Sequence, residues 1–516
     1  MAVGFLSLSQ EILWVRVVAF TLYGLSQSFA LVLFCFLVGI AVGSGVGKRF
    51  CERHGDLLRT SAIVLALAGV VDVSLVVLLP ALMHQRAGLA GVLLLVALTA
   101  ALKSVMFPIA HHLGSQQSGA RIGRSMSKVY FGNIVGSALG PIVTGYVLLD
   151  HMTLDHCLLL IGLSTGVLSL LCAARARTLA VGLAGVGVIV SVVVLAWSGA
   201  ATMVQSIALA TLRTIQPGTK VEHVVQNRHG IIHTTSTPDG APDTTFGGNI
   251  YDGRINVDMR VNYNALDRAL VLLAVHPKPE RVLVIGLSTG AWTRILLSSP
   301  RIREMTVVEI NPGYLEIMSR YPQVAGVLSD ARVKIVIDDG RRWLRRNRNE
   351  AFDLIVQNTT LSWRSYSTNL LSLEYMQLVA SHLRPGGIAA FNSTSSGDVL
   401  KTALEVFPFV ERRYNFIYGS GTDFSRATGT AAQAYRELRL NGTEVFAEAS
   451  YGPGGLVSDM MNAPFVPREQ QFVGMSASPE VITDQNMVVE QAHGLMREFL
   501  PAFYRAVDKA RAWLRN

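Results

Sequence analysis

The chain has 516 residues, of which 50% are hydrophobic and 16% are charged, and its formal net charge at pH 7 is +9. With a mean hydropathy of +0.38, it is too apolar for an ordinary soluble protein of this length. Part of the basic excess lies in loops between apolar runs, which favours membrane orientation over nucleic-acid binding. All four cysteines lie in the apolar first half, which excludes a disulfide framework in the second half.

The first 199 residues consist mainly of apolar runs separated by short polar loops. A helix needs about 20 apolar residues to cross a bilayer. Gln10, Glu11 and Arg16 interrupt the first run, which makes it the weakest candidate. We predict a multi-pass α-helical membrane bundle over residues 1–199, with the lipid bilayer as its partner. Its seven candidate spans are 4–23, 27–47, 60–83, 88–110, 129–149, 157–174 and 179–198.

Two of these runs carry glycine at every fourth position. This spacing places bare backbone on one helix face and lets helices approach closely. It predicts a compact bundle, and the same faces allow a homodimer. The glycines are Gly39, Gly43 and Gly47 in one run and Gly132, Gly136 and Gly140 in the other.

Basic residues cluster after the second, fourth and sixth runs, whereas the alternate loops are nearly free of them. By the positive-inside rule, the loops with these clusters are cytoplasmic. A seventh span would then place the C-terminal half outside the cytoplasm, and a miscounted segment would reverse that side. We predict a multi-pass protein of the cell (inner) membrane and leave the side of the C-terminal half open. The clusters are Lys48, Arg49 and Arg53; Arg121, Arg124 and Lys128; and Arg175 and Arg177.

The texture of the sequence changes near Lys220. Residues 200–219 are interpreted as a linker and 220–260 as a small β-domain, because short alternating runs there end in Gly, Asp and Pro turns. Three histidines of this region (His223, His229 and His233) have no cysteine or carboxylate cluster at ligand spacing. We therefore predict no metal site.

Strands and helices alternate from residue 261 onward. "RVLVIGL", "EMTVVEI", "VKIVIDDG" and "FDLIVQNTT" read as buried strands, and helical segments such as "TRILLSS" and "LEYMQLVASHL" lie between or after them. Such alternation predicts an α/β domain over 261–516, with a mostly parallel sheet covered by helices on both faces. Ligands of such sheets bind beyond the carboxyl ends of the strands.

Three successive strand ends carry residues that suit a nucleoside. Gly286 and Gly290 allow a tight turn and a close backbone approach to a ligand. Glu309 ends the second strand, where a carboxylate can accept two hydrogen bonds from a ribose diol. Asp339, after the third strand, can accept a hydrogen bond from an adenine amino group. We therefore predict a nucleoside-containing ligand, or descent from a protein that bound one.

The motifs of the C-terminal half resemble those of the spermidine synthases (polyamine aminopropyltransferases). The motifs are "YDGRINVD", "HPKPERVLVIGLSTG", "VVEINPGYLE", "ARVKIVIDDGRRWL", "LRPGGI" and "ITDQNMVVE". The apolar half is similar to the membrane part of fused transporter-like/spermidine-synthase proteins. The resemblance implies a small β-domain followed by a Rossmann-like, class I methyltransferase-like domain.

The same resemblance implies a donor of the S-adenosylmethionine type, either decarboxylated S-adenosylmethionine or S-adenosylmethionine, and no metal. The glycine loop (Gly286, Ser288 and Gly290) would hold its methionine-derived tail. Glu309 would hold its ribose and Asp339 its adenine. The usual loop is richer in glycine and includes an Asp, whereas Leu287, Ser288 and Thr289 stand at the corresponding positions here.

A larger departure follows the fourth strand. Where the family has a catalytic Asp and a second Asp three residues later, this chain has Asn358 and Leu361. An amide cannot take a proton from an attacking amine at neutral pH. Asp338 is the candidate for a substitute base. The candidate substrate-binding residues nearby are Trp363, Arg364 and Tyr366, and Arg364 suits a carboxylate or phosphate better than a polyamine.

The sequence thus leaves more than one function open. The family implies aminopropyl transfer to a polyamine, whereas the departures favour another small-molecule acceptor, anionic or lipid-like. An S-adenosylmethionine-dependent methyltransferase is a related alternative. A different class is a transporter-like or sensory membrane protein whose C-terminal domain binds a ligand without chemistry; an extracytoplasmic location of that domain would favour it.

Overall fold

In the computed structural model the chain divides into two compact units, residues 1–231 and 232–516. Arg121 and part of the predicted linker 200–219 lie outside the residues that the structure describes. The domain boundaries predicted at residues 200, 220 and 261 stay predictions. The described residues are 1–53, 55–85, 88–116, 122–197, 202–212, 216–358, 361–475, 478–487 and 489–490.

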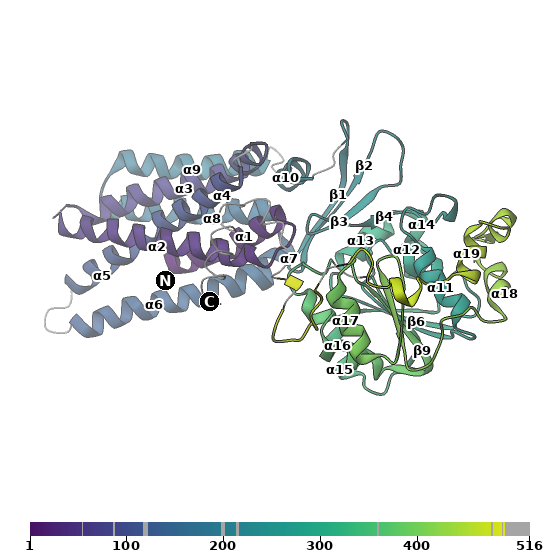
Figure 1. The fold of residues 1–516 in the computed structure, drawn as a ribbon. Coiled ribbons are helices and arrows are strands. Elements are labelled where there is room, and N and C mark those ends of the chain that lie inside the picture. The colour runs from purple at the N-terminus through teal and green to yellow at the C-terminus, as the bar shows by residue number, and fades with distance from the viewer. Residues whose placement is uncertain are drawn as a thin grey trace. The chain divides into compact units, whose positions relative to one another are not determined.

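The first unit is built mainly from long helices (Figure 1). Within the described residues, seven helical segments are long and apolar enough to cross a membrane, by length and composition. The predicted series of long apolar helices is therefore confirmed. The helices are α1 (Ala2–Thr21), α2 (Gln27–Glu52), α3 (Leu57–Met83), α4 (Gly88–Ser104), α5 (Met106–Gln116), α6 (Ile122–Val143), α7 (Leu149–His151), α8 (Leu154–Arg175), α9 (Leu179–Trp197) and α10 (Met203–Thr211).

The glycine faces lie at close helix contacts. A Cβ added to Gly43 of α2 would come within 2.1 Å of the carbonyl oxygen of Ala101 on α4. One added to Gly136 of α6 would lie 2.1 Å from the carbonyl oxygen of Met1, beside α1. Because any side chain at these positions would overlap backbone, the bare strips let α2 pack on α4 and α6 pack on α1.

A buried polar cluster joins four helices of this unit. Lys103 Nζ of α4 donates to both carboxylate oxygens of Asp72 on α3, at 2.7 and 2.8 Å, and to Gln10 Oε1 of α1 at 2.5 Å. Gln10 Nε2 and the Thr165 hydroxyl of α8 also donate to Asp72, at 2.7 and 3.0 Å. All four side chains are at most 2% exposed, and the opposite charges are paired.

Arg16, which interrupts the first apolar run, points its guanidinium at backbone. It donates to the carbonyl oxygen of Gly230 at 2.7 Å and also to that of Asn227. The positive charge of Arg16 is therefore solvated by the carbonyl groups of the two residues that flank the turn at 228–229.

Four short strands precede the large sheet. They pair in the order β1-β2-β3-β4, and β3 is antiparallel to both β2 and β4. Turns such as Gly248–Asn249, both with positive φ, separate the strands. The strands are β1 (Lys220–Asn227), β2 (Gly230–Ser236), β3 (Thr244–Gly247) and β4 (Ile250–Arg254).

The second unit is centred on a seven-stranded mixed sheet with the order β10-β11-β9-β8-β5-β6-β7. Strands β9, β8, β5, β6 and β7 are mutually parallel, and β11 and β10 extend the sheet antiparallel. The predicted Rossmann-like domain is confirmed. The strands are β5 (Arg281–Ile285), β6 (Glu304–Glu309), β7 (Val333–Ile337), β8 (Phe352–Gln357), β9 (Leu383–Asn392), β10 (Phe409–Arg413) and β11 (Phe416–Ser420).

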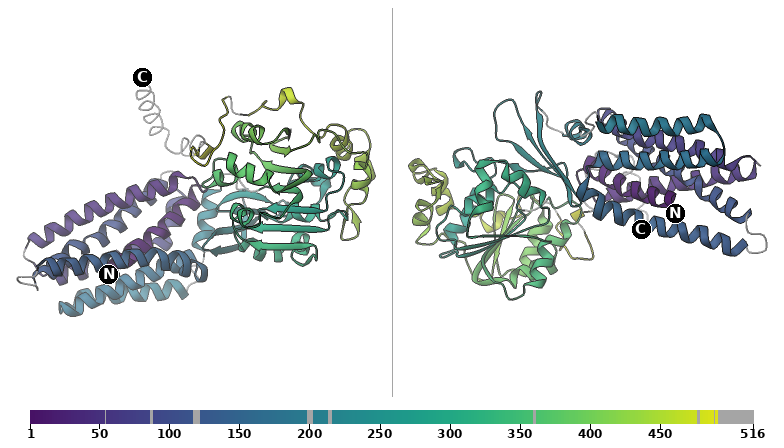
Figure 2. Two further views of the ribbon diagram at one scale, coloured as in Figure 1. Left: turned by 90° about the horizontal axis from the view of Figure 1, so that it is seen from below. Right: turned by 180° about the vertical axis from the view of Figure 1, so that it is seen from behind.

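Helices cover both faces of this sheet, as Figures 1 and 2 show. One face carries α15, α16 and α17, whose buried side chains form one core with β5, β8 and β9. The central strands read as continuous apolar runs because both of their faces are buried. The helices are α11 (Asp267–Val275), α12 (Ala291–Leu296), α13 (Gly313–Ser319), α14 (Pro322–Ala325), α15 (Gly340–Arg346), α16 (Leu373–Ala380), α17 (Gly397–Val406), α18 (Ala431–Arg436) and α19 (Leu456–Asn462).

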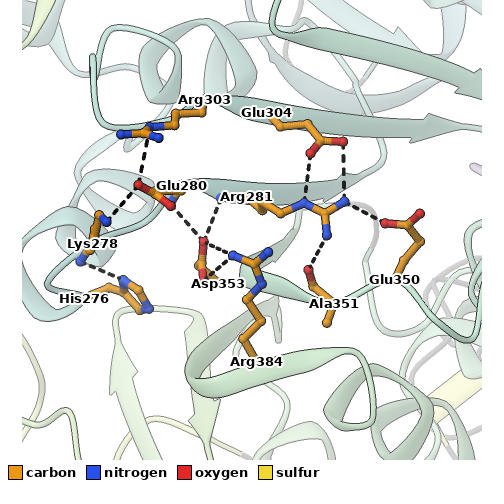
Figure 3. A network of polar contacts seen from close by, with 10 residues as sticks. All are labelled: His276, Lys278, Glu280, Arg281, Arg303, Glu304, Glu350, Ala351, Asp353 and Arg384. Carbon is orange, nitrogen blue, oxygen red and sulfur yellow. Dashed lines mark hydrogen bonds and ion pairs between the residues drawn. The ribbon is translucent and has the colours of Figure 1, made fainter.

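Charged side chains pair with one another at the amino ends of the parallel strands (Figure 3). Arg281, at the start of β5, bridges Glu304 at 2.9 Å and Glu350 at 2.7 Å. Asp353 accepts the backbone N–H of Arg281 at 2.7 Å and is paired with Arg384 at 3.3 Å. This network, which we call the amino-edge network, ties β5, β6 and β8 together at the edge away from their carboxyl ends.

Candidate functional site

A cavity of about 280 Å³ opens at the carboxyl ends of β5 and β8. The chain order reverses there, since β5 has β6 on one side and β8 on the other, and α/β sheets bind ligands at such points. Among the described residues, Asp252 is the only acidic side chain on the wall of this cavity, whereas Arg268 and Arg364 are cationic. The cavity is therefore the candidate site, and its wall is net positive.

The loop after β5 turns through left-handed backbone. Gly286, Ser288 and Gly290 have φ angles of 85°, 51° and 75°. Gly286 and Ser288 line the cavity, and the Ser288 hydroxyl donates to the backbone carbonyl of Asp252. Gly290 lies outside the lining, and a Cβ there would come within 2.3 Å of Met318 Cε. Gly290 is thus explained by packing and backbone conformation, whereas Gly286 and Ser288 face the site.

Glu309 lies beside this loop at the end of β6 and is 3% exposed. Its carboxylate accepts the backbone N–H of Leu287 at 2.7 Å and that of Asn311 at 2.8 Å. Burial raises the pKa of Glu309 to about 7, although these two hydrogen bonds oppose the shift. The side chain of Leu287 is itself buried, so this position contributes its backbone to Glu309. Glu309 is not part of the cavity lining.

Asp338 and Asp339 follow β7 directly, and neither lines the cavity. Asp339 caps α15, where its Oδ1 accepts the backbone N–H of Arg342 at 2.7 Å. Asp338 is ion-paired with the guanidinium of Arg342 and lies 3.8 Å from that of Arg346. Asp338 therefore lies between two guanidinium groups, and its role as a substitute base stays a prediction.

Asn358 is the last of a hydrogen-bonded series of side chains on the cavity wall. Arg268 Nη1 donates to Asn415 Oδ1. Asn415 Nδ2 donates to Asn392 Oδ1 at 2.9 Å, and Asn392 Nδ2 donates to Asn358 Oδ1 at 2.9 Å. All four side chains line the cavity, so three asparagines and one arginine occupy the region next to β8 and β9.

The three residues predicted to bind substrate are placed differently from one another. Arg364 lines the cavity, as does Leu361. Trp363 is half-buried and lies outside the lining. Tyr366 is 78% exposed and donates its backbone N–H to the Glu490 carboxylate at 3.0 Å. Of the three, only Arg364 belongs to the described cavity wall.

Asp252 is a site residue that the sequence reasoning missed. It lies on β4, far along the chain from the glycine loop, and accepts a hydrogen bond from the Tyr314 hydroxyl. Burial raises the pKa of Asp252 to about 6, partly opposed by that hydrogen bond and by the charge of Arg364. The signal was present in "NIYDGRINVD", where a carboxylate interrupts a strand.

Arg268 was missed as well. It lies near the start of α11, whose other residues up to Val275 are almost all apolar. Its guanidinium lies 5.1 Å from the centre of the Tyr414 ring, and burial lowers its pKa. A single charge in the apolar run "RALVLLAV" was the available signal.

The histidines of the small sheet play no part in this cavity. His233 is fully buried and stacks on Phe246 with ring centres 4.8 Å apart, and burial lowers its pKa to about 3. No group of three or more His, Cys, Asp or Glu side chains that could hold a metal ion occurs among the described residues.

Comparison with protein families places a match over the central part of this unit. Residues 269–412 match the model of the spermine/spermidine synthase domain. The polyamine aminopropyltransferase of Leptospira biflexa is 31% identical over 147 residues, which are 28% of this chain and 52% of that protein. The Bacillus subtilis polyamine aminopropyltransferase is 29% identical over 151 residues, which are 28% of this chain and 54% of that protein. The chain thus spans about half the length of the curated relatives it matches.

Among solved structures, spermidine synthase from Thermotoga maritima aligns with a TM-score of 0.35 and 20% identity. The alignment covers 47% of this chain and 87% of that one. The residues matched by the domain model include β5 to β9 and therefore the glycine loop, Glu309 and Asn358.

Proposed function

Because the C-terminal part of the chain carries a spermine/spermidine synthase domain, we propose that the protein is a membrane-bound transferase that uses an S-adenosylmethionine-type donor. The observation that carries the proposal is the buried Glu309 carboxylate at the end of β6, beside the glycine loop at the point where strand order reverses. The seven long apolar helices support its place in a membrane.

The donor site consists of residues from three strand ends. Glu309 would accept hydrogen bonds from ribose hydroxyls, since each carboxylate oxygen has a lone pair beyond the one used by Leu287 or Asn311. Asp339 would hold the adenine amino group. Gly286 and Ser288, which line the cavity, would approach the tail. The donor supplies an electrophilic carbon next to a sulfonium; the residues of this chain bind and orient it.

If this chain has the activity after which its relatives are named, the group transferred is an aminopropyl group and the acceptor is a polyamine. Amine attack needs a base, and Asn358 offers an amide. Asp252 supports such chemistry better, because it is a carboxylate on the cavity wall whose pKa burial raises to about 6. Methyl transfer from S-adenosylmethionine is the alternative within the same class.

A second candidate is a membrane protein that binds a ligand in this domain without chemistry. The amide at Asn358, fixed by Asn392, favours it, since no acceptor of a proton stands at the position of the family's catalytic Asp. The two candidates differ in turnover and share the donor site.

Calorimetric titration of the full-length chain in detergent tests the proposal. The ligands are decarboxylated S-adenosylmethionine, S-adenosylmethionine and methylthioadenosine, each added to the wild type and to Glu309→Ala. We expect binding that Glu309→Ala weakens at least about tenfold, because two charged hydrogen bonds are lost. The preferred donor separates aminopropyl from methyl transfer, and product release separates the enzyme from the non-catalytic protein. Absence of binding to a folded wild-type chain would overturn the proposed function.

A further inference from the structure

We propose that the acceptor side of the cavity binds a small molecule through an oxyanion, a carboxylate or a phosphate group, held by Arg268, Asn358 and Arg364. That this molecule is the acceptor of the transfer rests on the proposed transferase function. The binding of the oxyanion does not depend on it.

The hydrogen-bonded series that ends at Asn358 runs in one direction. A guanidinium has only donors, so Asn415 turns its oxygen to Arg268 and its amide nitrogen to Asn392. The backbone N–H of Thr394 donates to Asn392 Oδ1 at 2.9 Å and fixes the second amide independently, because it too can only donate. The amide nitrogen of Asn392 therefore faces Asn358, and the Oδ1 atom of Asn358 accepts its hydrogen bond.

Asn358 consequently presents donors to the cavity. Its Oδ1 is occupied by Asn392, and within the described residues no acceptor bonds its Nδ2. A carboxylate at this position would offer acceptors to a protonated amine. The amide, oriented as it is, offers N–H groups instead, so the hydrogen-bond polarity is reversed and matches the oxygens of an anion.

Within the described part of the chain, no carboxylate forms an ion pair with Arg268, whereas a neighbouring arginine has two such partners. Arg413 is bonded to Asp267 at 3.1 Å and to Asp459 at 2.6 Å. Arg268 is bonded to the neutral amide of Asn415, and its Nε is buried without a hydrogen-bond partner in the described part of the chain. Arg268 lines the cavity, so its positive charge, which has no carboxylate ion-pair partner among the described residues, would attract an oxyanion at the wall.

Arg364 adds a second positive charge to the same wall. No carboxylate of the described residues forms an ion pair with it, although its charge acts on Asp252. Two guanidinium groups thus face one carboxylate, which repels a polycation and attracts an anion. An oxyanion is already deprotonated at neutral pH, so its presence beside Asn358 demands no base at that position.

A second hollow, of about 540 Å³, adjoins the first cavity and is also lined by arginine side chains. It shares Arg268, Thr394 and Asn415 with the first cavity and adds Arg412. The terminal nitrogens of Arg412 donate to carbonyl oxygens, and its Nε is buried without a partner among the described residues. The polar wall of the first cavity therefore continues into a second hollow that Arg412 makes more positive.

The test titrates the full-length chain in detergent with sodium phosphate, sodium malonate and spermidine at constant ionic strength. Each titration is made with and without saturating methylthioadenosine. We expect one of the two anions to bind and spermidine not to displace it. The phosphate and malonate arms tell which oxyanion the site prefers.

Four variants locate the binding. Arg268→Gln, Arg364→Gln and the nearly isosteric Asn358→Asp should each weaken anion binding roughly tenfold or more, since each removes charge-assisted donors. Arg436→Gln is the matched control, because Arg436 is paired with Glu448 away from the cavity. Near-UV circular dichroism identical to that of the wild type confirms that each variant is folded.

Equal weakening in Arg436→Gln, or spermidine binding that displaces both anions, would overturn the oxyanion site. If methylthioadenosine binds and neither anion does, the oxyanion site falls and the donor site stands. If an anion binds and methylthioadenosine does not, the oxyanion site stands and the donor site falls. If nothing binds to the folded chain, both proposals fail.

Discussion

Charged groups differ between the two ends of the parallel strands, because they are paired at the amino ends and partly unpaired at the carboxyl ends. At the amino ends, Arg281 and Asp353 are paired with partners at 2.7–3.3 Å (Figure 3). At the carboxyl ends, burial raises the pKa of Glu309 to about 7 and that of Asp252 to about 6. The Nε of Arg268 has no hydrogen-bond partner there within the described residues.

The amino ends of the strands thus contribute to the stability of the sheet, whereas the carboxyl ends of the same sheet are suited to bind a ligand. Paired charges at the amino edge hold strands together and leave little to a ligand. Groups with perturbed pKa values and unfilled donors cluster at binding sites, because a ligand completes what the protein leaves open. A sheet of this kind is therefore expected to lose stability when one edge is changed and binding when the other is changed.

The largest expected effect is on stability, from Asp353→Ala. The change leaves the backbone N–H groups of Glu280 and Arg281 without their acceptor, which should lower the free energy of unfolding of the second unit by about 3 kcal/mol. Peptides of β5 and β8 should then exchange amide hydrogens roughly a hundredfold faster in the full-length chain. Asp353→Asn keeps an acceptor and should lose less. Unchanged exchange would show that this edge does not hold the sheet.

The next effect is on ligand affinity at the other edge. The pKa of Glu309 is raised from 4.5 to about 7, so the folded state binds the extra proton between these values. This carboxyl's contribution to stability is therefore full below pH 4.5 and is lost as pH rises through 7. The affinity for a nucleoside should instead increase as pH rises through 7, because the ribose hydroxyls donate best to an ionised carboxylate. Methylthioadenosine should bind about tenfold more weakly at pH 6 than at pH 8. Glu309→Gln is the control and should remove this dependence; a flat wild-type profile would contradict it.

A smaller effect concerns the balance of charge in the cavity. Asp252→Asn removes the one acidic side chain of the described wall, so sulfate should bind about threefold more tightly at pH 8. At pH 5, below the Asp252 pKa of about 6, the wild type and the variant should bind sulfate alike. Sulfate keeps its charge over this range, so calorimetry at the two pH values isolates Asp252. A gain that persists at pH 5 would point to a cause other than charge.

The smallest effect is expected from Arg281→Lys. The two acidic partners of Arg281 are 49% and 42% exposed, and solvent screens such pairs. The free energy of unfolding should fall by less than about 0.5 kcal/mol, with hydrogen exchange in β5 less than about 2.5-fold faster. An effect as large as that of Asp353→Ala would mean that the exposed bridges, rather than the buried carboxylate, hold the amino edge.

The architecture could be predicted because its signals are local. Continuous apolar runs marked the long helices, and alternation of strands and helices marked the mixed sheet. Glu309 could be placed at a strand end for the same reason.

The other wall of the site could not be predicted, because it is assembled from distant segments. Arg268 and Asn415 are 147 residues apart, and Asn358 and Asn392 are 34 apart. No local pattern in a single sequence says that these side chains meet. The donor-binding role of Gly290 stays a prediction, and the structure adds a packing reason for glycine there, because an added Cβ would come within 2.3 Å of Met318 Cε.

On the proposal that the first unit spans a membrane, the buried Lys103–Asp72 pair has a consequence for how that unit is inserted. On a translocon scale, each of these charges would cost roughly 2.5–3.5 kcal/mol at the centre of a helix that inserts by itself. The two charges lie on the consecutive helices α3 and α4 and are neutralised only when these helices lie together. We therefore expect α3 and α4 to partition into the bilayer as a hairpin. In a glycosylation-mapping assay, α4 alone should insert poorly, α3–α4 should insert well, and Asp72→Leu should abolish that advantage.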